Sequence, residues 1–266
     1  MIGWIRMVPA LTMVAAATPF LLVLQILSLK TGLWSDRVIP SLFHRLVIRA
    51  LGFRIHVHGK MARDRPLLIA SNHISWTDIM VLGSVAQVHY IAKSETRSWP
   101  VVGLLARCQR SVFVSRERRG QSGRQADEIA SRLASGDPMV LFAEGSTGDG
   151  NHLLPFKSTL FGAAARAVAD GQIERVFIQP VAIAYTRLHG MPMGRQHRTH
   201  AAWIGDDDLA THILALLREG GVDVEIRFGQ PIEFDRLSSR KAVTSRVEAE
   251  VRAMFNAALA APRRSK

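Results

Sequence analysis

The sequence contains little cysteine, tyrosine or acidic charge, and each shortage excludes a class of protein. A single cysteine, Cys108, rules out an intrachain disulfide framework and is compatible with a reducing compartment. Its apolar surroundings at positions 101–106 favour a buried structural thiol over a nucleophile. Only two tyrosines occur, and there is neither zinc-finger spacing nor an aromatic ribonucleoprotein motif, so no nucleic-acid partner is expected. An apolar content of 48% argues against a disordered chain.

Basic residues outnumber acidic residues by 34 to 22, which gives a formal net charge of +12. Arginine supplies 28 of the 34 basic residues. Such an excess favours an anionic partner, either an acidic membrane surface or a phosphorylated small molecule. We expect the anionic membrane surface, because of the segment with which the chain begins.

The N-terminal segment has no charged residue from position 8 to position 29, between Arg6 and Lys30. This run is as long as the roughly 20 apolar residues that cross a bilayer. A signal peptide is the alternative, because alanines occupy positions 15–17, but the apolar run continues well beyond them. Lys30, Arg37, Arg45 and Arg49 follow the segment and Arg6 precedes it. The positive-inside rule therefore predicts that the rest of the chain faces the cytoplasm at the inner membrane.

The remaining chain alternates short apolar runs with helical patterns, which is typical of an α/β domain. We expect a membrane anchor and an amphipathic helix at 1–52, the α/β domain at 53–260 and a basic tail at 261–266. The helix at 41–51 fits either a position on anionic lipid or packing against the domain. The predicted fold class is α/β, with a mixed, mostly parallel sheet flanked by helices. Pro180 interrupts an apolar strand and predicts an edge or a bulge there.

His73 directly follows a short apolar run, residues 67–70, and Asp78 stands five positions after it. A buried strand over this run would deliver His73 at its carboxyl end, where open α/β sheets collect reactive groups. Ser75 is a good N-cap residue, so a helix beginning there would hold Asp78 within reach of the imidazole. A carboxylate on one ring nitrogen makes the other nitrogen a better base. The alternative is a satisfied histidine beside a helix-capping aspartate.

Four short blocks occur in an order that resembles the glycerolipid acyltransferases related to bacterial 1-acylglycerol-3-phosphate acyltransferase. NHISWTD at 72–78 resembles the His-x4-Asp block of that family. RSVFVSR at 110–116 is similar to the second block, and FAEGS at 142–146 to the third, usually Phe-Pro-Glu-Gly-Thr. IQPVA at 178–182 resembles the fourth, an apolar strand centred on proline. Together the blocks cover roughly residues 67 to 185.

The resemblance implies that His73 is a general base oriented by Asp78, and that the acceptor hydroxyl attacks an acyl thioester directly. A serine hydrolase is disfavoured, because Ser146 lies in EGSTG and not in a Gly-x-Ser-x-Gly elbow. The resemblance further implies that the acceptor is bound by Arg116, Glu144, Gly145 and Ser146, with Lys157 as a further candidate. Acyl-CoA or acyl carrier protein would be the co-substrate, and neither a metal nor a redox cofactor is expected.

Two positions depart from the family pattern. Ala143 replaces the proline of the third block, and Thr147 replaces the arginine that usually follows it in phosphate-binding members. EGSTGDGN at 144–151 and LPFK at 154–157 resemble the branch that includes lyso-ornithine lipid acyltransferases, whose acceptor has an amino-acid head group.

The sequence thus predicts a membrane-bound O-acyltransferase acting on a lysolipid. Its first predicted acceptor is 1-acyl-sn-glycerol-3-phosphate, which would give phosphatidic acid, and lyso-ornithine lipid is the alternative. A non-catalytic, basic, membrane-tethered binding protein is the alternative from a different class.

Overall fold

The structure is a computed structural model that describes residues 2–115, 122–169, 173–205 and 207–260. Nine strands of this part of the chain form one sheet, in the order β1-β8-β6-β2-β5-β3-β4, with β7 and β9 paired to β6. The strands are β1 Arg54–His58, β2 Leu67–Ser71, β3 His89–Lys93, β4 Val112–Val114, β5 Met139–Phe142, β6 Arg175–Leu188, β7 Met191–Pro192, β8 Val222–Phe228 and β9 Ile232–Asp235. The α-helices are α1 Ile2–Thr31, α2 Val38–Leu51, α3 Thr77–Val85, α4 Pro100–Cys108, α5 Ser122–Ala134, α6 Gly162–Ala169, α7 Arg195–Arg198, α8 Leu209–Glu219 and α9 Arg240–Ala260. The predicted fold class, a mixed and mostly parallel sheet flanked by helices, is confirmed.

Three parallel strands at the middle of the sheet bring distant parts of the chain to one edge. β2 lies between β5 and β6, and all five of its residues are buried. Its last residue, Ser71, lies opposite Phe142 in β5 and Val181 in β6. The Ala143 N–H then donates to the Ser71 carbonyl oxygen at 2.9 Å, one step beyond the end of β5. The segments after β2 and β5 therefore leave the sheet side by side, at the carboxyl ends where functional groups gather.

The prediction that Pro180 lies at the edge of the sheet is wrong. Its strand, β6, has β2 on one side and both β8 and β9 on the other, so it is interior to the sheet. β9 pairs with Arg175 to Ile178, and β8 pairs from Val181 onward. Pro180 lies between the segments of β6 that pair with β9 and with β8. Its lack of an N–H group therefore removes no hydrogen bond from either strand pair. The register shift of β6 lies farther along, between Tyr185 and Arg187.

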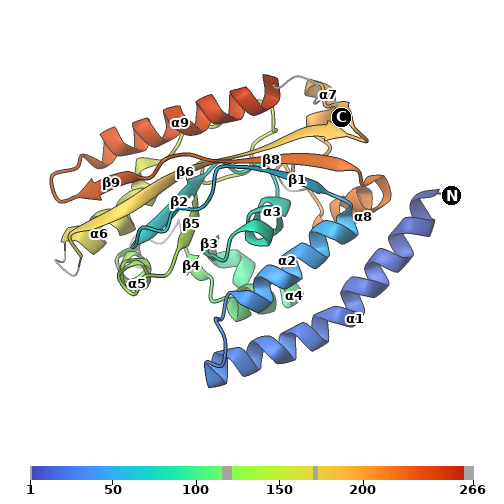
Figure 1. The fold of residues 1–266 in the computed structure, drawn as a ribbon, viewed down its shortest axis with the longest axis horizontal. Coiled ribbons are helices and arrows are strands. Elements are labelled where there is room, and N and C mark those ends of the chain that lie inside the picture. The colour runs from blue at the N-terminus through green and yellow to red at the C-terminus, as the bar shows by residue number, and fades with distance from the viewer. Residues whose placement is uncertain (1, 116–121, 170–172, 206, 261–266) are drawn as a thin grey trace.

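Helices cover both faces of the sheet (Figure 1). α9 lies along one face, while α2 and α3 pack together on the other face with α1 outermost. The contact between α2 and α3 is close because the His44 imidazole rests on Gly83, where a Cβ would lie 1.9 Å from Nδ1. Burial lowers the pKa of His44 to about 4, so the imidazole is neutral at physiological pH. The packing of these two helices therefore depends on the absence of a side chain at position 83.

α1 is fixed to the domain near both of its ends. Arg6 donates to the carbonyl oxygens of Leu51 and Glu219, at the C-termini of α2 and α8, where helix dipoles favour a cation. Near the other end, Gln25 donates to the carbonyl oxygens of Asp36 and Cys108 at 2.8 and 2.7 Å. Residues 4–31 are long and apolar enough to cross a membrane, and much of this helix is exposed. The predicted anchor is thus a helix that also packs along the domain.

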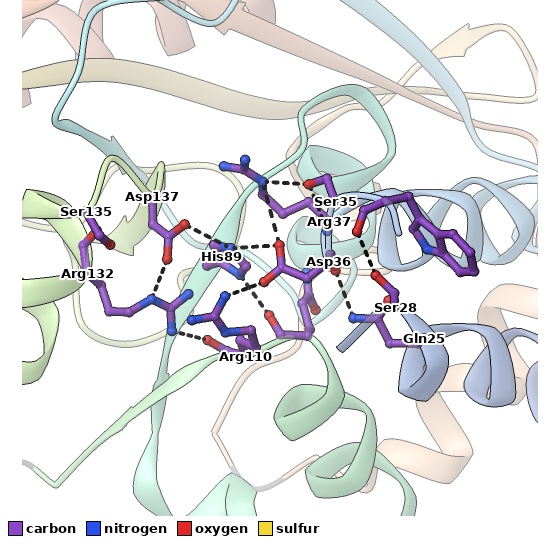
Figure 2. Close-up of polar contacts among 12 residues, drawn as sticks. Gln25, Ser28, Ser35, Asp36, Arg37, His89, Arg110, Arg132, Ser135 and Asp137 are labelled. Atoms are coloured by element: carbon purple, nitrogen blue, oxygen red, sulfur yellow. Dashed lines mark hydrogen bonds and ion pairs between the residues drawn. The ribbon is translucent and has the colours of Figure 1, made fainter. Parts of the chain in front are cut away.

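A polar cluster around the buried His89 joins the turn between α1 and α2 to the start of β3 (Figure 2). His89 is fully buried, and its Nδ1 donates to a backbone carbonyl at the end of α4 at 2.9 Å. Its Nε2 lies 3.8 Å from Asp36 Oδ1 and 3.6 Å from Asp137 Oδ1. Burial alone would raise the pKa of Asp137, but contacts with His89 and Arg132 hold it well below its usual range. Arg110, which follows α4, pairs with Asp36, and Arg132 of α5 pairs with Asp137, so ion pairs connect this turn to both helices.

Candidate active site

The structure brings His73 and Asp78 into direct contact. His73 lies two residues beyond the end of β2, and Asp78 lies in the first turn of α3, which begins at Thr77 and thus two residues later than expected. Asp78 Oδ2 is 2.8 Å from His73 Nδ1. A carboxylate accepts hydrogen bonds, so Nδ1 carries the proton and Nε2 keeps its lone pair. The Asp78 side chain is fully buried and that of His73 is 18% exposed, so the accessible partner is the one that can act as a base.

The carboxylate of Asp78 is the centre of a larger network. Besides His73, its Oδ2 accepts from the backbone N–H groups of Ile74 and Ser75, at 2.6 and 2.9 Å. Its Oδ1 accepts from the hydroxyl group of Tyr185 at 2.7 Å. Four donors stabilise a buried charge that would otherwise be costly to keep ionised. Asp78 therefore holds both the imidazole and the backbone segment that carries it.

The backbone around His73 is held from neighbouring segments as well. The His73 N–H donates to Glu144 Oε2 at 2.9 Å, and the His73 carbonyl accepts from the Gly148 N–H at 2.8 Å. The Ile74 carbonyl accepts from the Trp203 N–H at 3.0 Å. Contacts to both sides of the loop leave it little freedom, as a preorganised base requires.

Two further side chains fix His73, although the sequence alone assigned them no role. Asn72 continues the pairing of β2 with β6: its side-chain amide donates to the Ile183 carbonyl at 2.9 Å and accepts from the Ile183 N–H at 2.8 Å. The Phe142 ring stacks on the His73 imidazole, with 4.0 Å between centroids and 13° between planes. The local sequence predicts a turn at Asn72 and a buried strand at Phe142. It therefore does not predict that either side chain holds His73 in place.

Glu144 is buried next to His73, with only 2% of its surface exposed. Its Oε2 accepts from the His73 N–H and its Oε1 from the Leu154 N–H, each at 2.9 Å. Burial raises the pKa of Glu144 to about 8, although these two donors oppose the rise. Both oxygens thus bind backbone in this arrangement, which makes Glu144 a residue that positions His73. Its contact with the acceptor stays a prediction.

The other residues with predicted binding roles lie on the same turn or shortly after it, apart from Arg116. Gly145 has a φ of +77°, in the left-handed region that favours glycine. Ser146 follows it and is exposed. Lys157 is exposed too, and its N–H donates to the Ala143 carbonyl at 2.9 Å, which returns the chain to this turn. Arg116 lies outside the described residues. The binding roles of all four stay predictions.

Tyr185 makes the clearest contact with Asp78 that was not predicted from the sequence. It lies on β6, is buried, and reaches Asp78 across a separation of 107 residues. Two features of the sequence could have pointed to this residue. It supplies the only hydroxyl group in the apolar run 176–185, and it is one of two tyrosines in the chain. A buried phenol usually has a hydrogen-bond partner, and a buried carboxylate is a strong acceptor.

This arrangement can remove a proton from an alcohol. His73 Nε2 can accept the proton, and Asp78 stabilises the imidazolium ion that results. Because the alcohol itself becomes the nucleophile, the chemistry needs no serine in the protein.

Within the described residues, no group of three or more histidine, cysteine, aspartate or glutamate side chains is arranged to hold a metal ion.

Comparisons with known proteins agree with this chemistry. Residues 54–184 match the model of the family described as acyltransferase. The chain is 50% identical to a lyso-ornithine lipid O-acyltransferase of Brucella abortus, with 97% of each chain covered, and 47% identical to one of Rhizobium meliloti, with 96% of this chain and 88% of that protein covered. It is 29% identical to a 1-acyl-sn-glycerol-3-phosphate acyltransferase of Neisseria meningitidis, over 79% of this chain and 78% of that protein.

Among solved structures, the 1-acyl-sn-glycerophosphate acyltransferase of Thermotoga maritima superposes with a TM-score of 0.63 at 21% identity and covers 100% of both chains. This likeness shows the fold. The relatives and the family model confirm the prediction of an enzyme. They do not support the alternative, a non-catalytic binding protein. The chain therefore belongs to the acyltransferase family, and within that family it is a lysolipid acyltransferase.

Proposed function

We propose that the protein is a membrane-bound lyso-ornithine lipid O-acyltransferase. The observation that carries this proposal is the 50% identity, over 97% of both chains, to a protein with that activity in its name. Similarity to a 1-acyl-sn-glycerol-3-phosphate acyltransferase is far lower, at 29%. The alternative acceptor of the sequence analysis thus replaces lysophosphatidate, the acceptor predicted first.

Thr147 supports the same acceptor. It is half-buried and stands three residues after Glu144, where phosphate-binding members of the family usually have an arginine. A phosphate dianion is best held by a guanidinium group, whose geometry matches two phosphate oxygens. Ornithine carries an amino group, for which an added cation at this position would be unfavourable.

The proposed reaction transfers an acyl group from a thioester to the acceptor hydroxyl. His73 Nε2 takes the hydroxyl proton as the oxygen attacks the thioester carbonyl, and Asp78 stabilises the charged imidazole. When the carbon–sulfur bond breaks, the imidazolium returns this proton to the leaving thiolate. The products are the ester and a free thiol, and the thioester would be acyl-CoA or acyl carrier protein.

The membrane location is supported by an apolar surface that extends over two elements. On α1, large apolar side chains are exposed, among them Phe20 at 65% and Val23 at 64%. Val101 and Leu104 are exposed on α4, which contacts α1. Basic residues follow α1 in the sequence, which favours binding of the domain to the anionic cytoplasmic leaflet of the inner membrane. A lysolipid would then reach the enzyme from the leaflet beneath it.

The proposal is tested by assaying the purified full chain in detergent with lyso-ornithine lipid and with lysophosphatidate, using labelled acyl-CoA and acyl carrier protein as donors. We expect kcat/KM for lyso-ornithine lipid to exceed that for lysophosphatidate by at least about tenfold, which corresponds to about 1.4 kcal/mol. A preference for lysophosphatidate with either donor would contradict the proposed acceptor.

Thr147→Arg sharpens this test. A new cation beside the head group should improve the use of lysophosphatidate and impair that of lyso-ornithine lipid, changing the ratio of the two kcat/KM values by about 10- to 100-fold. Thr211→Arg, which adds the same charge on an exposed position of α8, is the control and should leave the ratio unchanged. An unchanged ratio in Thr147→Arg would mean that position 147 does not face the head group.

A further inference from the structure

The hydroxyl group of Tyr185 is held rigidly by the centre of the sheet. Tyr185 is 1% exposed, and its ring packs edge-on against Phe53 with 6.3 Å between centroids. Its backbone lies opposite Val224 of β8, and β2 flanks the same strand on the other side. From this position the hydroxyl contacts Asp78 Oδ1 at 2.7 Å. It touches the oxygen of Asp78 that His73 does not use.

The direction of the hydrogen bonds follows from the number of protons. Tyr185 has one hydroxyl proton, and the carboxylate of Asp78 can only accept it. Thr77 Oγ1 lies 2.6 Å from the Tyr185 oxygen, so Thr77 must be the donor of that bond. Burial, together with the charge of Asp78, raises the pKa of Tyr185 well above its usual range, so the phenol keeps its proton. A chain of donors therefore runs from Thr77 through Tyr185 to Asp78, and each bond polarises the next.

We infer that Tyr185 is a positioning residue that sets the basicity of His73 through Asp78. Its donor stabilises negative charge on Oδ1 and so limits the charge that Oδ2 presents to the imidazole. Without this donor the buried carboxylate is less stabilised, and the pair of Asp78 and His73 binds a proton more tightly. His73 is then protonated, and lost as a base, at higher pH. Tyr185 acts in this way only if His73 is the base, as proposed above.

Three other titratable groups face Asp78 and stay in place when Tyr185 is changed. They are His73 after β2, Tyr90 on β3 and Glu144 after β5. Tyr90 offers a matched control, because it is equally buried and its hydroxyl donates to the Ile79 carbonyl of α3 at 2.8 Å. Removing that hydroxyl costs a buried hydrogen bond on the same helix but leaves both oxygens of Asp78 with their donors.

The experiment compares the pH dependence of kcat and KM for the full chain in detergent, with the lysolipid that wild type turns over. For Tyr185→Phe we expect the acidic limb of the kcat profile to move to higher pH by about 0.5 to 1 unit. KM should change by less than about threefold, because the proposed change is in the base and not in the binding of the acceptor. Tyr90→Phe should keep the wild-type limb, whatever it costs in melting temperature.

Thr77 gives an independent measurement if Tyr185→Phe does not fold. Thr77→Val removes the donor to Tyr185 and should move the limb in the same direction by a smaller amount, while Thr77→Ser should restore the wild-type profile. An unshifted limb in Tyr185→Phe, or in Thr77→Val if that is the variant that folds, would overturn the inference, and so would an equal shift in Tyr90→Phe. His73→Ala, measured in parallel, distinguishes failure of the proposed mechanism from failure of the inference about Tyr185. Full activity of His73→Ala would contradict the proposed mechanism. An inactive His73→Ala together with an unshifted limb in Tyr185→Phe would contradict only the role of Tyr185.

Discussion

Two buried carboxylates, Asp78 in α3 and Glu144 directly after β5, hold His73 from different elements of the fold. Asp78 accepts four hydrogen bonds in all, and Glu144 accepts one from the His73 N–H and one from the Leu154 N–H. The difference in donors has an electrostatic consequence, because two backbone donors do not offset the burial of Glu144. Glu144 therefore contributes to the pH dependence of the protein's stability.

We expect the folded state to lose stability as the pH rises through the range in which Glu144 titrates. Folding raises the pKa of Glu144 from 4.5 to about 8, so the folded protein keeps a proton that the unfolded chain releases. This stabilisation is fully present below pH 4.5 and is lost as the pH rises to about 8. Melting temperatures in detergent, from about pH 5 to about pH 8, should decline more for wild type than for Glu144→Gln. Glu233→Gln, at an exposed position on β9, should follow wild type. Parallel declines for wild type and Glu144→Gln would contradict the raised pKa.

Among the strands and helices, the sequence predicted what depends on local pattern. The apolar runs that end before His73 and Glu144 are β2 and β5, and the helix that carries Asp78 begins close to its expected position. These features follow from the period of apolar residues and from helix capping, both of which are local. The predicted contact between His73 and Asp78 follows from them, because only five positions separate the two residues.

Contacts across long separations in the chain could not be predicted in the same way. Pro180 is compatible with an interior strand only because β8 and β9 leave a gap beside it, which depends on residues some 50 positions later. Tyr185 meets Asp78 because β6 lies next to β2. The packing of α1 along the domain depends on where the C-termini of α2 and α8 meet Arg6. None of these neighbours is encoded by periodicity.

α1 gives a prediction at the level of a single helix. Phe20→Glu combined with Val23→Glu places two charges on its exposed apolar face. If this face lies in lipid, binding to vesicles of phosphatidylcholine and phosphatidylglycerol should weaken by at least about tenfold, since burying one such side chain is worth about 1.5–3 kcal/mol. Leu237→Glu is the control, because Leu237 is 95% exposed in the segment between β9 and α9. Equal sedimentation of the two proteins with vesicles would contradict a membrane role for this face.

The molecule as a whole connects the apolar N-terminal helix to the proposed catalytic pair, His73 and Asp78, through two layers of packed helices. α1 packs on α2, α2 packs on α3, and α3 carries Asp78 (Figure 1). The polar cluster around the buried His89 fixes the turn between α1 and α2 to the sheet (Figure 2). The surface proposed to meet the membrane and the base proposed to act on a lipid therefore belong to one packed body, which suits an acceptor that stays in the bilayer.

The most direct measurement is the turnover of lyso-ornithine lipid by His73→Ala, compared with wild type and with His152→Ala. His152 is an exposed histidine in the loop that follows Glu144, so it controls for the loss of an imidazole without the catalytic geometry. We expect His73→Ala to lose about 10²- to 10⁴-fold in kcat, because the base is removed, while vesicle binding is unchanged and the protein still melts cooperatively. His152→Ala should keep wild-type turnover. Near-wild-type turnover by a clean preparation of His73→Ala would contradict His73 as the base of this acyltransferase.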